Sequence, residues 1–133
     1  MAKEFIFKGK TIEELKKISI EDFAKIVDSR IRRSLKRNQN KTLNKKILKA
    51  TKIKETGKEP KPIKTHLRDT IVIPNMVGLR FAIYNGKEFQ TIEILPEMLG
   101  HYFGEVVLTR KRLMHGKAGI GATKSSTAIT ARK

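Results

Sequence analysis

The chain has 133 residues, contains no cysteine and carries a formal net charge of +17, from 30 Lys and Arg side chains against 13 Asp and Glu. This length suits one modest domain with a small core, and the lack of cysteine excludes disulfides and thiolate zinc sites. So large a positive excess attracts polyanions, which makes nucleic acid the leading class of partner. Without a signal-peptide pattern or a membrane-spanning apolar run, we expect a soluble, cytoplasmic protein with no membrane partner.

The positive charge is concentrated in two flanks. Residues 1–29 carry six basic and six acidic side chains, whereas residues 30–54 carry eleven Lys and Arg and no acid. Residues 69–105 have two basic and five acidic side chains, and residues 106–133 have seven basic and none acidic. This distribution predicts a near-neutral folded centre between two segments that grip a polyanion.

The N-terminal region, residues 1–57, has helical patterns throughout and is basic from residue 30. Thr11 and Glu14 have the spacing of a capping box that opens a short helix ending near Lys17. Ser19 begins a second, longer helix, whose apolar stripe consists of Phe23, Ile26, Val27, Ile31 and Leu35. After a break at residues 38–40, a third helical pattern runs to about Gly57.

Residues 58–68 form a proline-containing connector, and from residue 69 the period changes to that of strands. The β-branched run at 70–73 predicts one strand and the alternation at 79–84 predicts another. Asn85-Gly86 predicts a two-residue hairpin turn, after which residues 87–94 return as the partner strand, with a bulge or burial on both faces as alternatives for its imperfect alternation.

Residues 96–103 predict a short helix after the sheet, so that residues 69–108 form a compact core and residues 109–133 a basic, glycine-containing tail. The predicted class is α+β: N-terminal helices, a small antiparallel three-stranded sheet with a short C-terminal helix, and an extended basic tail. The predicted core centre consists of Phe81, Ile83, Ile92, Ile94, Met98, Leu99 and Phe103.

The stretch GKAGIGATKSS, residues 116–126, contains the residue types of a phosphate-binding loop. Gly116 and Gly121 have the separation of a nucleotide loop, but Ala122 and Thr123 follow where the motif needs Lys and then Ser or Thr. No buried strand precedes the stretch and no amphipathic helix follows it. This rules against a small-nucleotide site and leaves the phosphates of a larger polyanion.

No catalytic or metal-binding constellation is visible in the sequence. His66, His101 and His115 are far apart, and Glu97 with His101 would supply two ligands where a metal needs three or four. The serines lack a nucleophile motif and the acids of the sheet region show no pairing for acid–base chemistry. We therefore expect no catalytic residue, no metal and no cofactor.

The basic segment RIRRSLKR, residues 30–37, favours phosphate binding over a solvated face, which would mix charge signs. A membrane surface is the alternative, although the apolar stripe is only wide enough for packing. The sequence has no helix-turn-helix, zinc finger or basic zipper, and no aromatic pair typical of an RNA-recognition sheet. Recognition through phosphates, 2′-hydroxyls and shape favours folded RNA. A nucleotide-acting enzyme and a DNA-compacting architectural protein are the competing hypotheses.

Residues 74–116 carry a set of short motifs whose spacing is highly specific. They are Pro74 with Met76 and Gly78, Asn85-Gly86-Lys87, Pro96-Glu97-Met98, Gly100-His101, Gly104-Glu105, Thr109-Arg110 and His115-Gly116. With them the chain resembles the small-subunit ribosomal proteins of the S-nineteen family, over about residues 11–126. The helical RIRRSLKR and the tail GIGATKSS resemble the archaeal and eukaryotic branch.

The resemblance implies a structural protein that binds rRNA in the head of the small ribosomal subunit and takes part in translation. It also implies contact with the thirteenth small-subunit protein and a tail that reaches toward the decoding region and tRNA. The alternative is a non-ribosomal nucleic-acid-binding architectural protein. The basic residues expected to contact RNA are Arg30, Arg32, Arg33, Lys36, Arg37, Lys45, Lys46, Lys49, Arg68, His101, Arg110, Arg112, His115, Lys117 and Lys124. The glycines expected to allow close backbone approach are Gly116, Gly119 and Gly121.

Overall fold

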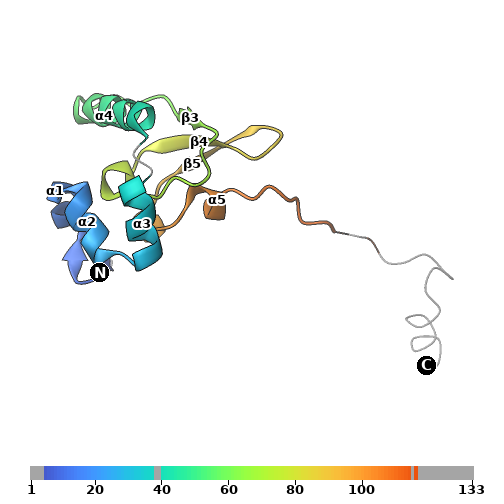
Figure 1. Ribbon diagram of the computed structural model, residues 1–133. Coiled ribbons are helices and arrows are strands. Elements are labelled where there is room, and N and C mark those ends of the chain that lie inside the picture. Colours follow the sequence, from blue (N-terminus) through green and yellow to red (C-terminus); the bar gives the residue numbers. More distant parts are fainter. Residues whose placement is uncertain (1–4, 38–39, 115, 117–133) are drawn as a thin grey trace, which may run out of the picture.

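The computed structural model describes residues 5–37, 40–114 and 116 and has the predicted α+β class. Figure 1 shows the N-terminal helices and the long helix α4 (Lys41–Glu55) on one side of the body and a β-hairpin projecting on the other. The C-terminal segment leaves the body beyond the last helix and extends away from it (Figure 1).

The first elements are a tight hairpin and a capped helix. Strands β1 (Ile6–Phe7) and β2 (Lys10–Thr11) pair antiparallel and lead directly into α1 (Ile12–Lys17). The predicted capping box is confirmed, because the Glu14 amide donates to the Thr11 hydroxyl and the Thr11 amide donates to the Glu14 carboxylate. This reciprocal pair satisfies two amides that a helix start otherwise leaves without partners.

The single long helix predicted after Ser19 is wrong, because the chain forms two helices there, α2 (Ile20–Ile26) and α3 (Ser29–Arg37). The chain is extended at Val27, which ends α2. The break keeps Phe23 and Val27 almost fully buried while α3 packs partly buried apolar side chains on the same core. Core packing therefore overrides a continuous helical period that the apolar spacing alone suggested.

The three-stranded sheet has the order β3-β4-β5 and is mixed. Strands β4 (Arg80–Tyr84) and β5 (Phe89–Glu93) pair antiparallel, as predicted, in a continuous register without the bulge that was one alternative. Strand β3 (Ile63–Thr65) pairs parallel to β4 and lies within the predicted connector, so the expectation of an all-antiparallel sheet is wrong. Parallel pairing needs a crossover of a dozen or more residues, which residues 66–79 supply.

The β-branched run at 70–73 forms no strand of that sheet. Its backbone instead runs beside residues 100–104: the Val72 amide donates to the His101 carbonyl at 2.9 Å, and the Gly100 amide donates to the Val72 carbonyl at 3.1 Å. Ile71 and Tyr102 form an isolated antiparallel bridge. Ile71, Val72 and Ile73 are all buried, which agrees with their apolar character. An apolar run predicts burial, but it does not identify the segment with which the run pairs.

The hairpin turn is displaced by one residue from the predicted Asn85-Gly86. The Asn85 amide donates to the Glu88 carbonyl at 3.0 Å, which leaves Gly86 and Lys87 at the two central positions. Gly86 has a φ of 102°, in the left-handed region that glycine adopts without strain. The Asn85 side chain accepts from the amides of Lys87 and Glu88, each at 2.9 Å.

The predicted helix at 96–103 is interrupted at Gly100, whose φ of 81° suits glycine. Two short elements result, the 3₁₀ turn η2 (Pro96–Met98) and the helix α5 (Phe103–Val106). A similar 3₁₀ turn, η1 (Pro74–Met76), lies at the end of the 70–73 run.

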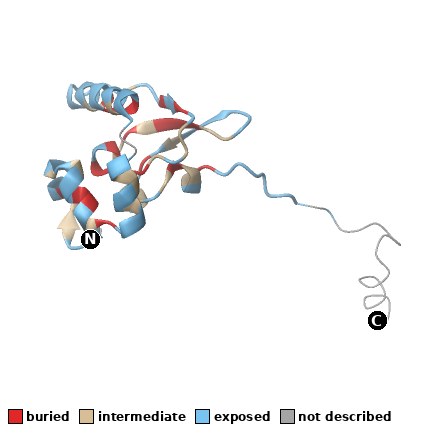
Figure 2. Ribbon diagram, in the orientation of Figure 1, coloured by how far each residue is buried: buried red, intermediate tan, exposed pale blue. Residues whose placement is uncertain are grey.

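One core joins the helices to the sheet (Figure 2). Phe81, Ile83, Ile94, Leu99 and Phe103 are buried as predicted, and Ile92 and Met98 are partly buried against them. The rings of Phe81 and Phe103 lie 5.0 Å apart between centroids. The helices contribute the rest of the core, in particular Leu15, Phe23, Val27, Leu43 and Ile47.

Candidate nucleic-acid interface

The outward face of α4 carries a row of lysines. Leu43, Ile47 and Ala50 are buried and fix the orientation of the helix on the body. Lysines that recur every three or four residues therefore share the opposite face. This α4 lysine row consists of Lys41, Lys45, Lys49 and Lys52, all exposed. Lys46, also predicted to bind RNA, is exposed on the flank of the row.

A second row lies on α3. Ile31 and Leu35 pack against the core, and three arginines occupy one side of the helix beside them. This α3 arginine row consists of Arg30, Arg33 and Arg37, all exposed. The Arg30 guanidinium lies 5.5 Å from the centre of the Tyr102 ring, a cation–π contact that orients it without neutralising its charge. Lys36 is exposed on the other side of α3.

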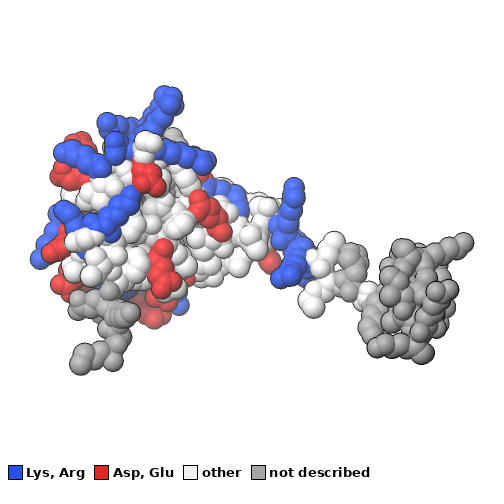
Figure 3. Space-filling model, turned by 90° about the horizontal axis from the view of Figure 1, so that it is seen from below, with Lys and Arg blue, Asp and Glu red and all other residues white. Residues whose placement is uncertain are grey.

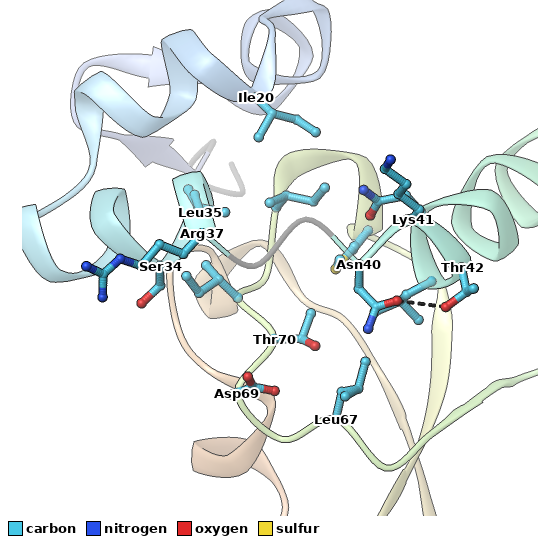
Figure 4. A pocket seen from close by; sticks show the side chains of 15 residues that line it. Ile20, Ser34, Leu35, Arg37, Asn40, Lys41, Thr42, Leu67, Asp69 and Thr70 are labelled. Atoms are coloured by element: carbon cyan, nitrogen blue, oxygen red, sulfur yellow. Dashed lines mark hydrogen bonds between the residues drawn. The ribbon is translucent and has the colours of Figure 1, made fainter.

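The two rows meet at a pocket of about 540 Å³ between the end of α3 and the start of α4 (Figure 4). Arg37 and Lys41, which end one row and begin the other, both line it. Its lining is otherwise mixed, with Ser34 and Thr70 among the polar side chains and Ile20 and Leu67 among the apolar ones. Figure 4 shows the guanidinium of Arg37 directed away from the pocket interior.

Arg32 is placed differently from its neighbours on α3. Its guanidinium donates to the carbonyl of Ala24 at 2.9 Å and to those of Lys25 and Val27 at 3.2 Å each. These are carbonyls at the C-terminal end of α2, where helical carbonyls lack intrahelical partners and a positive charge is favourable. Arg32 therefore caps α2, a use that the sequence did not indicate because the two helices were expected to be one.

The Arg68 side chain also forms hydrogen bonds within the protein. Its guanidinium donates to the carbonyls of Tyr84 at 2.9 Å and Gly104 at 3.1 Å, and to that of Val107. It thereby ties the end of β4 to α5 and to the point where the C-terminal segment begins. A Cβ at Gly104 would lie 3.3 Å from the Arg68 carbonyl oxygen, so glycine permits this close approach.

The remaining predicted residues lie toward the C-terminus. His101 is exposed and its Nδ1 lies 2.5 Å from a Glu105 carboxylate oxygen, which is a hydrogen-bond distance. Arg110, Arg112 and Gly116 are exposed on the segment that leaves the body. The other residues of the prediction, His115, Lys117, Gly119, Gly121 and Lys124, lie outside the described residues.

The balance of acidic and basic side chains differs between parts of the molecule. Figure 3 shows basic and acidic side chains interspersed over the body, with basic side chains gathered again where the C-terminal segment starts. Ion pairs occur on the body, for example Lys8–Asp28 and Lys25–Asp22, both at 2.8 Å. Hydrogen bonds from Lys25 and Lys8 lower the pKa of Asp22 and Asp28 respectively, and the bond from Asp22 raises the pKa of Lys25. In contrast, α3 and α4 up to Lys54 contain no acid with which their cations could pair locally.

Other chemistries find little support in the described part of the chain. Within residues 5–37, 40–114 and 116, no three His, Asp or Glu side chains gather so as to hold a metal ion. In that same part, no helix has the length and apolar character needed to cross a membrane. Ser19 caps α2, and the Ser34 hydroxyl lies 3.2 Å from that of Tyr102, so these serines have structural partners.

An aromatic cluster on the sheet was missed by the sequence analysis. His66, Tyr84 and Phe89 lie in mutual contact, with ring centroids 4.6 to 5.2 Å apart. The three residues belong to different strands or strand ends, and only the register that pairs Tyr84 with Phe89 brings them together. The sequence predicted the hairpin but not this register, because a turn centred on Asn85-Gly86 would have paired Phe89 with Ala82 instead of Tyr84.

The comparison with protein families agrees with this architecture. The model of the family described as ribosomal protein S19 matches residues 32–115, which is more than half of the 133 residues. The match begins inside α3, includes α4, the sheet and α5, and ends at the root of the tail. The chain belongs to the ribosomal protein S19 family, a non-enzymatic kind of protein, and the family indicates a structural protein of the small ribosomal subunit.

Proposed function

We propose that this protein binds small-subunit rRNA through the α4 lysine row, the α3 arginine row and the basic root of its tail. The observation that carries the proposal is the exposure of all eleven Lys and Arg side chains of residues 30–54, a stretch without acid, although two of them, Arg32 and Lys54, donate to carbonyls of the protein. Lysines four residues apart on one helix face repel each other, so the α4 row lowers the stability of the isolated helix. Contact with phosphates would remove that repulsion.

The geometry favours phosphate contact over reading of base edges. A row of flexible lysine side chains matches a row of phosphates, and each contact releases condensed counterions. Membership of the ribosomal family supports RNA rather than DNA as the polyanion. Arg32 and Arg68 take no part in this surface, since their guanidinium groups bind carbonyls of the protein; His101, Lys46 and Lys36 border it.

The finer placement rests on the resemblance to the family, not on the charged surface. We place the protein in the head of the subunit, beside the thirteenth small-subunit protein, with residues 109–133 reaching toward the decoding region and tRNA. The departure of the chain from the body after Val107 and the exposure of Arg110 and Arg112 support a tail of this kind. Residues 5–31 precede the family match yet share the core, which supports an N-terminal extension of the archaeal and eukaryotic type.

The test is the salt dependence of binding to purified small-subunit rRNA. The variant replaces Lys41, Lys45, Lys49 and Lys52 by Gln. If each lysine contacts one phosphate, the slope of log affinity against log salt should become less negative by about 0.7 to 0.9 per lost contact. A matched control replaces four lysines of β2, α1 and α2, namely Lys10, Lys16, Lys17 and Lys25, and so changes the net charge equally.

The control variant should keep a slope close to that of the wild type. Equal changes in both variants would mean that only total charge matters and would remove α4 as the binding surface. Binding of duplex DNA as tight as that of rRNA would favour the architectural alternative. Wild-type protein that does not bind rRNA at all would contradict the proposal as a whole.

A further inference from the structure

One face of the β-sheet carries a partly exposed aromatic cluster beside a lysine. By register, Lys64 of β3, Ala82 of β4 and Thr91 of β5 lie side by side on this face. Tyr84 and Phe89 pair on the same face, opposite to the face of buried Phe81 and Ile83. His66 follows β3 and contacts both rings, at 4.6 Å from Tyr84 and 5.0 Å from Phe89 between centroids.

The cluster is not part of the hydrophobic core. Phe89 is 37% exposed, His66 is exposed and Tyr84 is half-buried, whereas the core aromatic rings Phe81 and Phe103 are fully buried. An aromatic ring that is exposed to water contributes its full hydrophobic free energy only when a partner covers it and removes its surface from water. The cluster therefore has unused apolar area that a flat partner could cover.

The side chains and turns around the cluster hold it in place. The Tyr84 hydroxyl donates to the Gly86 carbonyl at 2.9 Å, and Arg68 donates to the Tyr84 carbonyl at 2.9 Å. The Leu67 amide donates to the Thr65 hydroxyl at 3.1 Å, which fixes the turn that carries His66. A surface that is already ordered loses little conformational entropy when a ligand stacks on it.

The charge beside the cluster distinguishes between possible partners. The Lys64 ammonium lies 5.6 Å from the centre of the Phe89 ring. An apolar side chain from a protein would cover the ring and strip water from that ammonium without compensating its charge, which is costly. A nucleotide has a group for each of the two features: its base can stack on the Phe89 ring, and its phosphate can pair with the Lys64 ammonium.

We propose that His66, Tyr84 and Phe89 form a stacking site for an unpaired base of the RNA, with Lys64 contacting an adjoining phosphate. The proposal rests on the proposed rRNA-binding function and adds a second mode of contact to it, distinct from the phosphate-binding rows on α3 and α4. Single-stranded nucleotides bind proteins in this way, through stacking on aromatic rings beside a cation.

The test compares Phe89→Leu with Phe89→Tyr in the full chain, with purified small-subunit rRNA as the probe. Leu keeps apolar area but lacks a flat ring, so affinity should fall by about 5-fold to 150-fold, the range expected for one stacked base. Tyr keeps the ring and should bind like the wild type. The salt slope should stay unchanged in both variants, because no cation is removed.

Leu95→Ala provides the matched control, since Leu95 is another exposed apolar residue (48%) that lies outside the cluster. Circular dichroism and thermal unfolding would show that the compared proteins are folded. His66→Ala supplies a second variant should Phe89→Leu unfold, and it should also weaken binding without changing the slope.

An rRNA affinity of Phe89→Leu within about twofold of the wild type, at equal folded fraction, would overturn the stacking site. If the same variant were then lost more easily from assembled small subunits, the face would belong to a protein neighbour, which also overturns it. Neither result touches the phosphate-binding proposal, which stands or falls with the salt slope of the α4 lysine variant.

Discussion

In α3 and α4 every Lys and Arg is exposed and no acid precedes Glu55, whereas residues 69–105 hold two basic side chains and much of the buried core. Helices α3 and α4 are attached to the body by the apolar side chains on their inner faces, such as Leu43 and Ile47. Residues 69–105 are held together by hydrophobic burial and by backbone pairing among themselves. The exposed cations of α3 and α4 are thus held in position by apolar side chains on the inner faces of the same helices.

The comparison also separates cations that look alike in the sequence. Arg32 and Arg68 donate to carbonyls at the ends of elements, and the Lys54 ammonium donates to the Gly78 carbonyl at 2.5 Å. Those residues stabilise the fold. Cations in the middle of an outward helix face have no such carbonyls within reach and are available to a polyanion.

The largest expected effect is that of Phe81→Ala. Phe81 is fully buried in β4 against Phe103, so the cavity should lower the free energy of unfolding by about 3–5 kcal/mol. Leu48→Ala on α4, where the side chain is 58% exposed, is the control and should change stability little. Urea unfolding followed by circular dichroism measures both. Equal effects would mean that α4 and the sheet do not differ in burial as described.

Arg68→Ala should have the next largest effect. It removes charge-assisted hydrogen bonds to the carbonyls of Tyr84, Gly104 and Val107. We expect a loss of about 1.5–3 kcal/mol in the free energy of unfolding, with an unchanged salt slope of rRNA binding.

Arg33→Ala should show the opposite combination of effects, with stability unchanged and the salt slope altered. Arg33 belongs to the α3 arginine row, so its loss should leave stability nearly unchanged and should make the salt slope less negative by roughly 0.7 to 0.9. A flatter slope for Arg68→Ala, or an unstable Arg33→Ala, would contradict the division between structural and RNA-binding cations.

The smallest expected effect concerns the Lys8–Asp28 pair, which links the β1–β2 turn to the junction of α2 and α3. The hydrogen bond from Lys8 lowers the pKa of Asp28 below its ordinary value of 3.8. Asp28 therefore stabilises the folded state above about pH 4, and this contribution is lost as the pH falls through the lowered pKa. Because both groups are exposed, the effect should be small.

Melting temperatures of Asp28→Asn and of the wild type, measured at intervals from neutral to acidic pH, should converge at the acidic end. Lys8→Met removes the partner and should reproduce the effect, and the double variant should be no less stable than either single one. A difference between wild type and Asp28→Asn that persists at low pH would show that the pair is not its source.

Several features could be read from the sequence because they depend on neighbours in the chain. The Thr11–Glu14 capping box, the single helix at 41–55 and the β4–β5 hairpin all follow from spacings of a few residues. The exposure of the α4 lysines follows likewise, since the apolar positions of one helix determine which face remains outside.

Contacts between distant segments were not readable in this way. Arg32 donates to carbonyls at the end of α2, next to the break at Val27. The parallel strand β3 lies in a segment marked by prolines, and the 70–73 run pairs with residues 100–104. In each case two segments with acceptable local patterns had several possible partners, and packing in the single core selected one.

By itself the sequence determined the α+β class, the two basic flanks and the family, since composition, charge order and motif spacing are properties of the chain. Only the tertiary structure decided which cations bind carbonyls and which face outward, and only it assembled His66, Tyr84 and Phe89 on one face. The physical reason is that a side chain's role depends on what lies within a few ångströms of it, and here those neighbours come from segments far apart in the sequence.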